Sequence, residues 1–245
     1  MKAFTVLFIA HLLGDYYFQP EALAEKKNTG AGWVLLHCLI YAAASSLCLL
    51  LLGGGFIWAA AAAAGAHFLI DLIKKLVIRK PLSAKSKRTV FVVDQSMHLL
   101  SILAASIWVT ESFELAVPPY MDGLARITGL DSYTLLSYIA LALAMMKPAN
   151  VFIRIMLAEG RQSEASVYDR MRTGRLIGSL ERLLVTALLV LGQYSSIALV
   201  FTAKSIARFK QLENRDFAEY YLFGTLLSAS VAVGAFVLMK FFGTL

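Results

Sequence analysis

Three polar side chains occur four residues apart in an apolar segment near the N-terminus. In the stretch FIAHLLGDYYFQPE these are His11, Asp15 and Gln19, and a spacing of four places them on one face of a helix. Polar groups are costly inside apolar membrane segments, so those that occur there commonly serve a function. We therefore expect this stripe to form one wall of a shared polar site.

The other histidines show the same association with acidic residues. Three of the four histidines in the chain stand four residues from an aspartate, and all four precede residue 100. The candidate metal ligands are His11, Asp15, His37, His67, Asp71, Asp94 and His98. Imidazole combined with carboxylate suits zinc, manganese or iron, whereas magnesium and calcium prefer oxygen ligands. We expect a divalent transition metal, with zinc first and manganese or iron as alternatives.

This set is larger than the four ligands that one tetrahedral ion takes. Either two ions lie close together, or some carboxylates orient the histidine rings without binding the metal. A metal lowers the pKa of a bound water towards about 7, and a remaining carboxylate acts as general base or acid. We expect Asp15 and Asp94 in that catalytic role. The alternative is a structural network of ion pairs, and Cys38 and Cys48 are interpreted as reduced packing residues.

The composition is that of an integral membrane protein. Of the 245 residues, 59% are hydrophobic and 16% are charged, whereas soluble domains have about 45–50% apolar and about 25% charged residues. We predict an all-α, polytopic helical bundle with a metal-site region, residues 1–115, and a C-terminal membrane region, residues 116–245. The eight or so membrane segments are expected at residues 3–19, 32–52, 56–78, 90–110, 132–153, 176–192, 195–210 and 219–241.

Charged loops predict the orientation of these segments. The loop KKLVIRKPLSAKSKR, residues 74–88, is basic, and the segment ESFELAVPPYMDG, residues 111–123, is acidic. Because basic loops stay in the cytoplasm, the first is expected inside, the second outside, and both termini outside. Every candidate ligand then falls in the cytoplasmic half of its helix. The net charge of +7 follows from this topology, and no nucleic-acid partner is expected.

The C-terminal half carries a second group of polar residues near the predicted cytoplasmic ends of its helices. Its basic members are Lys147, Arg182, Lys204 and Arg208, and Glu181 is expected to pair with Arg182. One interpretation is that these cations bind a phosphate or diphosphate group of a substrate. The alternative is that they set the topology and extend towards the membrane interface.

Four blocks within about the first 110 residues carry a family resemblance. They read HLLGDYYFQP, LLHCLIYA, HFLIDLIKK and VDQSMHLLS, and in this order they resemble the signature of a bacterial membrane-protein family, domain of unknown function 3307. The His/Asp pattern is also similar to that of bacterial inner-membrane proteins labelled metal-dependent hydrolases. The resemblance implies a metal site at the same seven residues and a location in the bacterial inner membrane, but it names no substrate.

These observations lead to three hypotheses about function. The first is a membrane-embedded, metal-dependent hydrolase that acts from the cytoplasmic side on an anionic or phosphorylated amphiphile, such as a membrane lipid. The second is an ion- or proton-coupled transporter or channel that uses the same His and Asp residues. The third is a structural or regulatory membrane protein. The outer halves of the helices are almost purely apolar, as in LLSILAASIWVT, which favours a one-sided site over a pathway; homo-oligomerisation stays open.

Overall fold

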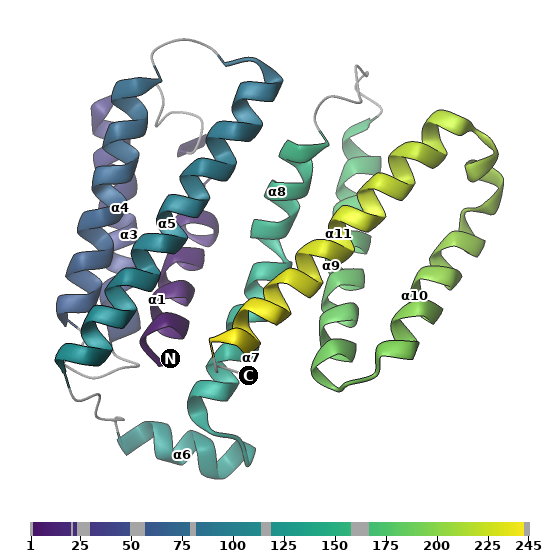
Figure 1. Ribbon diagram of the computed structural model, residues 1–245. Coiled ribbons are helices and arrows are strands. Elements are labelled where there is room, and N and C mark those ends of the chain that lie inside the picture. The colour runs from purple at the N-terminus through teal and green to yellow at the C-terminus, as the bar shows by residue number, and fades with distance from the viewer. Residues whose placement is uncertain are drawn as a thin grey trace. The chain divides into compact units, whose positions relative to one another are not determined.

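The computed structural model describes residues 2–20, 22–23, 30–49, 57–78, 82–113, 119–157 and 167–242. Within these ranges every regular element is a helix (Figure 1), which confirms the predicted all-α class. The chain divides into two compact units, the first being Met1–Ala140 with Phe242–Leu245 and the second Leu141–Phe241.

The first unit extends beyond the predicted division at residues 115/116. It includes α6, Pro119–Thr128, and most of α7, Ser132–Met145. The hydroxyl oxygens of Thr5 and Ser137 lie 3.3 Å apart, so α7 is attached to the first helix of the chain. The sequence analysis treated the start of α6 as part of an external loop, and its helical structure was not anticipated.

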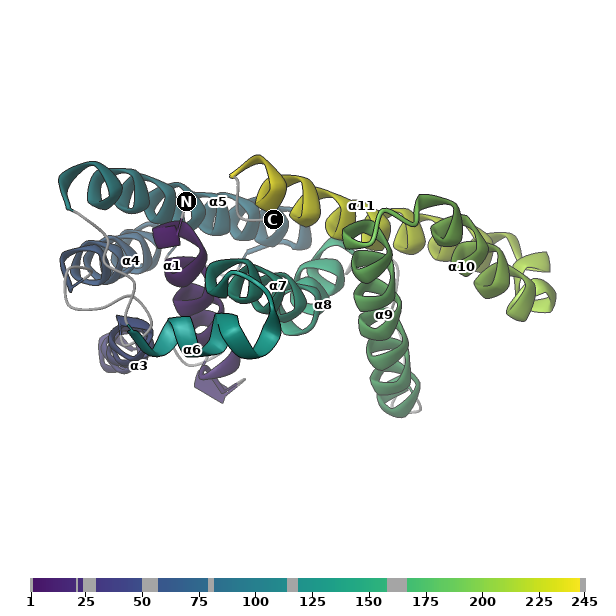
Figure 2. The same cartoon turned by 90° about the horizontal axis from the view of Figure 1, so that it is seen from below.

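Among the described residues, four helices form the bundle of the first unit (Figure 2). They are α1 (Lys2–Leu12), α3 (Ala31–Leu49), α4 (Ile57–Val77) and α5 (Ala84–Ser112). α1 is buried along almost its whole length and contacts α3 and α5, and α4 also contacts both of these helices. Ala59, Ala60 and Ala63 of α4 are buried, and such small residues let membrane helices approach closely.

In the described part of the chain, four helical stretches are long and apolar enough to cross a membrane. They are α4, α5, the stretch Ser132–Met156 and α11 (Arg215–Phe241). Leu69 and Ile73 of α4 and Leu100 of α5 are each more than half exposed. Extended apolar surface of this kind is unfavourable in water and is typical of a lipid-facing surface. These stretches support the predicted class of helical membrane protein, and in the described residues they number four rather than the predicted eight.

The second unit contains α8 (Lys147–Met156), α9 (Val167–Val190), α10 (Tyr194–Ala207) and α11. α9 and α10 form a tight hairpin at the sequence LGQYSS, residues 191–196, where Gly192 adopts a φ of +69° that glycine accepts most easily. α11 packs against α8 and α9. The core between these helices is built by Met145, Val185, Leu189 and Ala232.

Candidate metal centre

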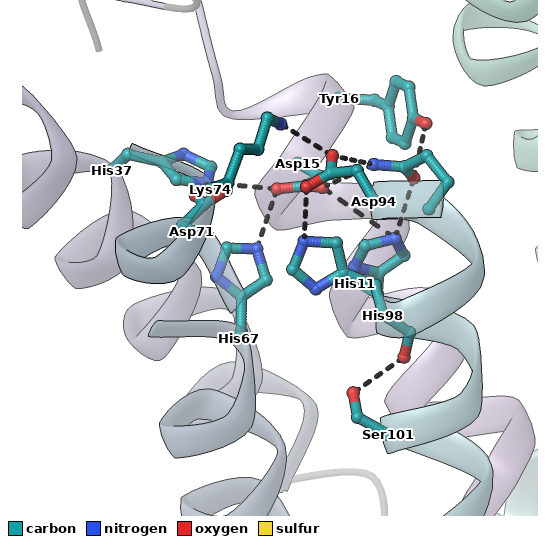
Figure 3. A network of polar contacts seen from close by, with 11 residues as sticks. His11, Asp15, Tyr16, His37, His67, Asp71, Lys74, Asp94, His98 and Ser101 are labelled. Carbon is teal, nitrogen blue, oxygen red and sulfur yellow. Dashed lines mark hydrogen bonds and ion pairs between the residues drawn. The ribbon is translucent and has the colours of Figure 1, made fainter. Parts of the chain in front are cut away.

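Seven His and Asp side chains of the first unit converge between the helices of the four-helix bundle (Figure 3). α1 and the turn after it supply His11 and Asp15, α3 supplies His37, α4 supplies His67 and Asp71, and α5 supplies Asp94 and His98. The four imidazoles are only 0–4% exposed. The structure therefore brings together every residue that the sequence analysis named as a candidate metal ligand.

The shortest contacts of the cluster surround Asp15. Its Oδ1 lies 3.0 Å from His37 Nε2 and 2.9 Å from His67 Nε2. His37 Nε2 also lies 3.2 Å from Asp71 Oδ2. In a tetrahedral zinc site with bonds of about 2.0–2.1 Å, neighbouring ligand atoms are about 3.3 Å apart. The three distances are thus close to the separation of two ligands that share one metal ion.

The remaining candidate ligands lie against this group. The ring centroids of His67 and His98 are 4.4 Å apart, those of His11 and His98 are 5.3 Å apart, and His98 Nε2 lies 3.8 Å from Asp94 Oδ1. The groups with ligand atoms within 4.8 Å of one another are His11–His67–His98, Asp15–His37–His67, Cys38–His67–Asp71 and Asp71–Asp94–His98. His67 belongs to three of these groups and is thus the central ligand.

A π-helical turn, Leu13–Tyr17, follows α1 and carries Asp15. The Phe18 N–H donates to Leu13 O at 2.7 Å, five residues earlier, and such turns occur often at functional sites. The turn packs closely on α3, because a Cβ added to Gly14 would lie 2.8 Å from Tyr41 Cδ2 and 3.2 Å from Tyr41 Cα. Tyr41 in turn stacks on the imidazole of His67, with ring centroids 3.7 Å apart. Glycine at position 14 therefore permits the contact that supports this ring.

Polar side chains extend the cluster at its rim. Gln95 Nε2 donates to Asp15 Oδ2 at 3.4 Å and to Asp94 Oδ2 at 3.3 Å, and Gln95 Oε1 accepts a hydrogen bond from the Tyr16 hydroxyl at 2.7 Å. Lys74 Nζ donates to Asp94 Oδ2 at 2.7 Å. The rim thus connects the carboxylates of two helices through one amide.

Sequence analysis did not identify the roles of Lys74, Tyr16 and Cys38 in this cluster. It assigned Lys74 to the basic loop that sets topology, yet the residue lies in the last turn of α4, three residues after Asp71. Residues three apart share a helix face, so the signal was present. The Lys74 side chain is 24% exposed. Cys38 lies near His67 and Asp71, whereas the Cys48 side chain lies outside the described residues.

The cluster fits a bound cation. In the described residues His11 Nδ1, His67 Nδ1, His98 Nε2 and Asp94 Oδ1 have no hydrogen-bond partner, although buried polar atoms nearly always have one. Carboxylates from three helices also approach one another, which is unfavourable without a compensating positive charge. Imidazole and carboxylate donors together suit a divalent transition metal.

Arg182 of the predicted basic cluster in the second unit makes its hydrogen bonds with other groups of the protein. Arg182 is 3% exposed. Its Nε donates to Met145 O at 2.9 Å, and its Nη atoms donate to Asn150 Oδ1 at 2.6 Å and to Ser179 and Ser228 Oγ at 3.3 Å each. All of these acceptors are neutral. Carbonyl, amide and hydroxyl oxygens thus surround the guanidinium.

The predicted pair of Glu181 and Arg182 is wrong. Glu181 Oε2 lies 2.6 Å from Lys204 Nζ, because consecutive helix residues point about 100° apart and face different neighbours. Arg208 lies over a tyrosine ring of α11, 5.9 Å from its centroid, and Lys147 is half-buried at the start of α8. The role of these four cations in substrate binding stays a prediction.

Comparison with known proteins gives a family match in the first half of the chain. Residues 3–122 match the family described as Protein of unknown function (DUF3307). The match contains all seven candidate metal ligands and the rim residues, and it ends before the second unit begins. No curated protein and no solved structure matches the chain. Residues 3–122 are therefore similar to the DUF3307 family, which confirms the resemblance that the sequence blocks indicated.

Proposed function

We propose that the protein is a membrane-embedded, metal-dependent hydrolase whose centre is the His/Asp cluster of the first unit. The observation that carries this proposal is the convergence of Asp15, His37 and His67, in which the carboxylate lies 3.0 Å and 2.9 Å from the two imidazoles. Zinc suits a mixed imidazole and carboxylate set best, and manganese or iron would also be accepted.

Two side chains of α5 are suited to activating a water molecule. His98 Nε2 and Asp94 Oδ1 lie 3.8 Å apart, and neither has a hydrogen-bond partner in the described part of the chain. A metal ion would lower the pKa of a water molecule towards about 7. Asp94 would then accept the proton as general base, while Asp15, which contacts two imidazoles, would bind the metal with them.

The substrate class follows from the surroundings of the centre. The helices that carry the cluster have apolar outer surfaces, as Leu69, Ile73 and Leu100 illustrate, so an amphiphile reaches the site from the bilayer. Lys74 at the rim is partly exposed and offers a positive charge to an anionic headgroup. We therefore favour a phosphorylated or otherwise anionic amphiphile, such as a membrane lipid.

The proposal also includes the topology of the chain in the membrane. We retain eight membrane segments and place the centre near the cytoplasmic face of the bacterial inner membrane. α5 has 29 residues, about 44 Å, which exceeds the roughly 30 Å of hydrocarbon. Its first turn carries the exposed Lys85 and Lys87, and basic residues favour the cytoplasm. Residues 79–81 and 114–118 of the two charged loops lie outside the described residues.

Transport is the rival function, and the remainder of α5 argues against it. The hydroxyls of Ser101, Ser106 and Thr110 donate to carbonyl oxygens of their own helix. These groups are therefore satisfied locally and, within the described residues of α5, do not continue the polar cluster. A proton or ion pathway would need polar groups along the whole membrane thickness.

Metal analysis and an activity assay test the proposal. The full-length protein purified in detergent is expected to retain zinc or another transition metal, and His37→Ala and His67→Ala are expected to lose it. Ser106→Ala, which alters a buried hydroxyl of the same bundle, is the matched control and should keep the metal. The loaded protein should hydrolyse an anionic lipid or phosphoester in mixed micelles. Metal-free wild-type protein would contradict the proposal, and metal-dependent ion flux in proteoliposomes without hydrolysis would favour transport.

A further inference from the structure

We infer that the centre takes one divalent ion, and that Lys74 supplies the positive charge which a second ion would otherwise bring. This inference rests on the proposed metal centre and specifies its stoichiometry, which the ligand count leaves open.

Two groups in the cluster share no ligand and would together form a two-ion centre. One group is Asp15, His37 and His67, and the other is Asp71, Asp94 and His98. The groups that share His67 cannot be filled at the same time, because a neutral imidazole offers one nitrogen to a metal and carries a proton on the other. The question is therefore whether the second of the two separate groups is available.

Lys74 already engages the second group. Its Nζ lies 2.7 Å from Asp94 Oδ2, so a cation is bound to one of the ligands that a second metal would need. An ammonium group and a divalent ion on the same carboxylate would repel each other strongly, because the buried surroundings screen charge poorly. In the Asp15, His37 and His67 group the two shortest contacts are between its own members, and the nearest contact with the second group, from His37 to Asp71, is longer at 3.2 Å. This first group is the place for the single ion.

The charge of the cluster supports the same conclusion. Ligand histidines are neutral and ligand carboxylates are ionised when a metal is bound, so Asp15, Asp71 and Asp94 contribute three negative charges. Lys74 and one divalent ion together contribute three positive charges, which makes the centre neutral. A second divalent ion would leave two excess positive charges among ligand side chains that are 7% exposed or less. Uncompensated charge at such burial is costly.

Removal of the lysine charge is therefore expected to open the second group. In Lys74→Met, two divalent ions leave one excess positive charge, which one hydroxide neutralises, and Asp94 Oδ2 no longer binds an ammonium group. Lys74→Arg keeps a cation at the rim and should keep the stoichiometry of the wild type. In the double variant Lys74→Met/Asp94→Asn the second group loses its carboxylate, so a single ion is again expected.

The experiment measures zinc per chain after the full-length protein has been stripped with a chelator, reloaded and freed of excess metal. Wild type, Lys74→Arg and the double variant should bind one equivalent, whereas Lys74→Met should bind two. Lys75→Met, which removes a neighbouring charge on the same helix, is the matched control and should bind one. Cobalt titration of the wild type, followed by visible absorption, should reach its endpoint at one equivalent and needs no variant to fold.

The outcomes distinguish the role of Lys74 from the existence of the metal centre. Two equivalents in the wild type, or one in a folded Lys74→Met variant, would overturn the role of Lys74 and leave the metal centre intact. A wild type that binds no metal would instead refute the centre itself.

Discussion

The two units of the chain both bury polar side chains between apolar helices, but they satisfy them differently. In the second unit the guanidinium of Arg182 donates to four neutral oxygens, from Met145, Asn150, Ser179 and Ser228. In the first unit several ring nitrogens and a carboxylate oxygen have no partner in the described residues, and carboxylates from three helices face the same space. The Arg182 guanidinium is thus bound by oxygens of the protein, whereas the cluster of the first unit leaves several of its potential ligand atoms without a partner in the described residues.

This difference separates a structural role from a binding role. A buried cation whose hydrogen bonds are all made by the protein stabilises helix packing and needs no ligand. A buried group of acceptors with unfilled positions is costly unless something else occupies it. Burial of polar groups in a membrane helix is thus by itself a weak sign of function, and the state of their partners is the stronger sign.

The largest expected effect is the loss of the metal when the central carboxylate is removed. Asp15→Ala takes away the oxygen that lies 2.9 Å from His67 and 3.0 Å from His37. Substitution of residues that merely support a ligand costs about 10–100-fold in metal affinity, so removal of a ligand should exceed about 100-fold. Zinc competition with a chromophoric chelator measures this. Arg182→Met should leave the zinc affinity unchanged. An equal loss of zinc affinity in Asp15→Ala and Arg182→Met would contradict the distinction between a binding role in the first unit and a structural role in the second.

Arg182→Met is expected to act on stability instead. It leaves Met145 O and Asn150 Oδ1 without their donor, and an unsatisfied buried polar group costs about 1–3 kcal/mol. We expect the free energy of unfolding in detergent to fall by about 2–4 kcal/mol, while the metal content stays the same. Arg215→Met is the control: this arginine pairs with Glu219 but its side chain is 89% exposed, and exposed pairs contribute about 0–1 kcal/mol. Similar losses in the two variants would contradict the structural role of Arg182.

Much of the first unit could be predicted from sequence because its signal is local. A spacing of four residues puts His67 and Asp71 on one helix face, and likewise Asp94 and His98. The predicted depth of each residue in the membrane follows from the boundaries of the apolar segments and the charges of the loops between them. The convergence of four helices needs only that the chain cross the membrane repeatedly at these positions. The existence of the His/Asp cluster was therefore accessible without coordinates.

What sequence could not give depends on contacts between distant helices. The partner of Glu181 is Lys204, on another helix, whereas local reasoning favoured its neighbour in the chain. The contact of Lys74 with Asp94 also joins two helices. It was not predicted because this lysine was interpreted as part of the basic loop that sets the orientation of the chain in the membrane. The helix Pro119–Thr128 has too few apolar residues to be recognised as a membrane segment. Side-chain pairing, rather than the presence of helices, is where the prediction failed.

Gly14→Ala is expected to have an intermediate effect on both metal binding and stability. The added methyl group would lie 2.8 Å from Tyr41 Cδ2 and 3.2 Å from Tyr41 Cα, so the π-helical turn must move away from α3. Overpacking of this kind costs about 1–3 kcal/mol, and displacement of Tyr41 also removes support from the His67 ring. Gly65→Ala on α4 is the control, because a Cβ there meets nothing within 4 Å. If Gly14→Ala matched this control in both stability and zinc affinity, the turn would not position the cluster.

The smallest expected effect is that of Tyr16→Phe at the rim. The hydroxyl of Tyr16 donates to Gln95 Oε1 at 2.7 Å, and its removal leaves the amide free to rotate away from the two carboxylates that it bridges. Loss of one such hydrogen bond costs about 1 kcal/mol, so zinc affinity should fall by only about fivefold while the stoichiometry stays at one ion. Tyr120→Phe, at a tyrosine that is 58% exposed, controls for loss of a hydroxyl in the same unit. If zinc affinity fell as much in Tyr16→Phe as in Asp15→Ala, the residues of the rim would bind the metal directly and would have to be counted among its ligands.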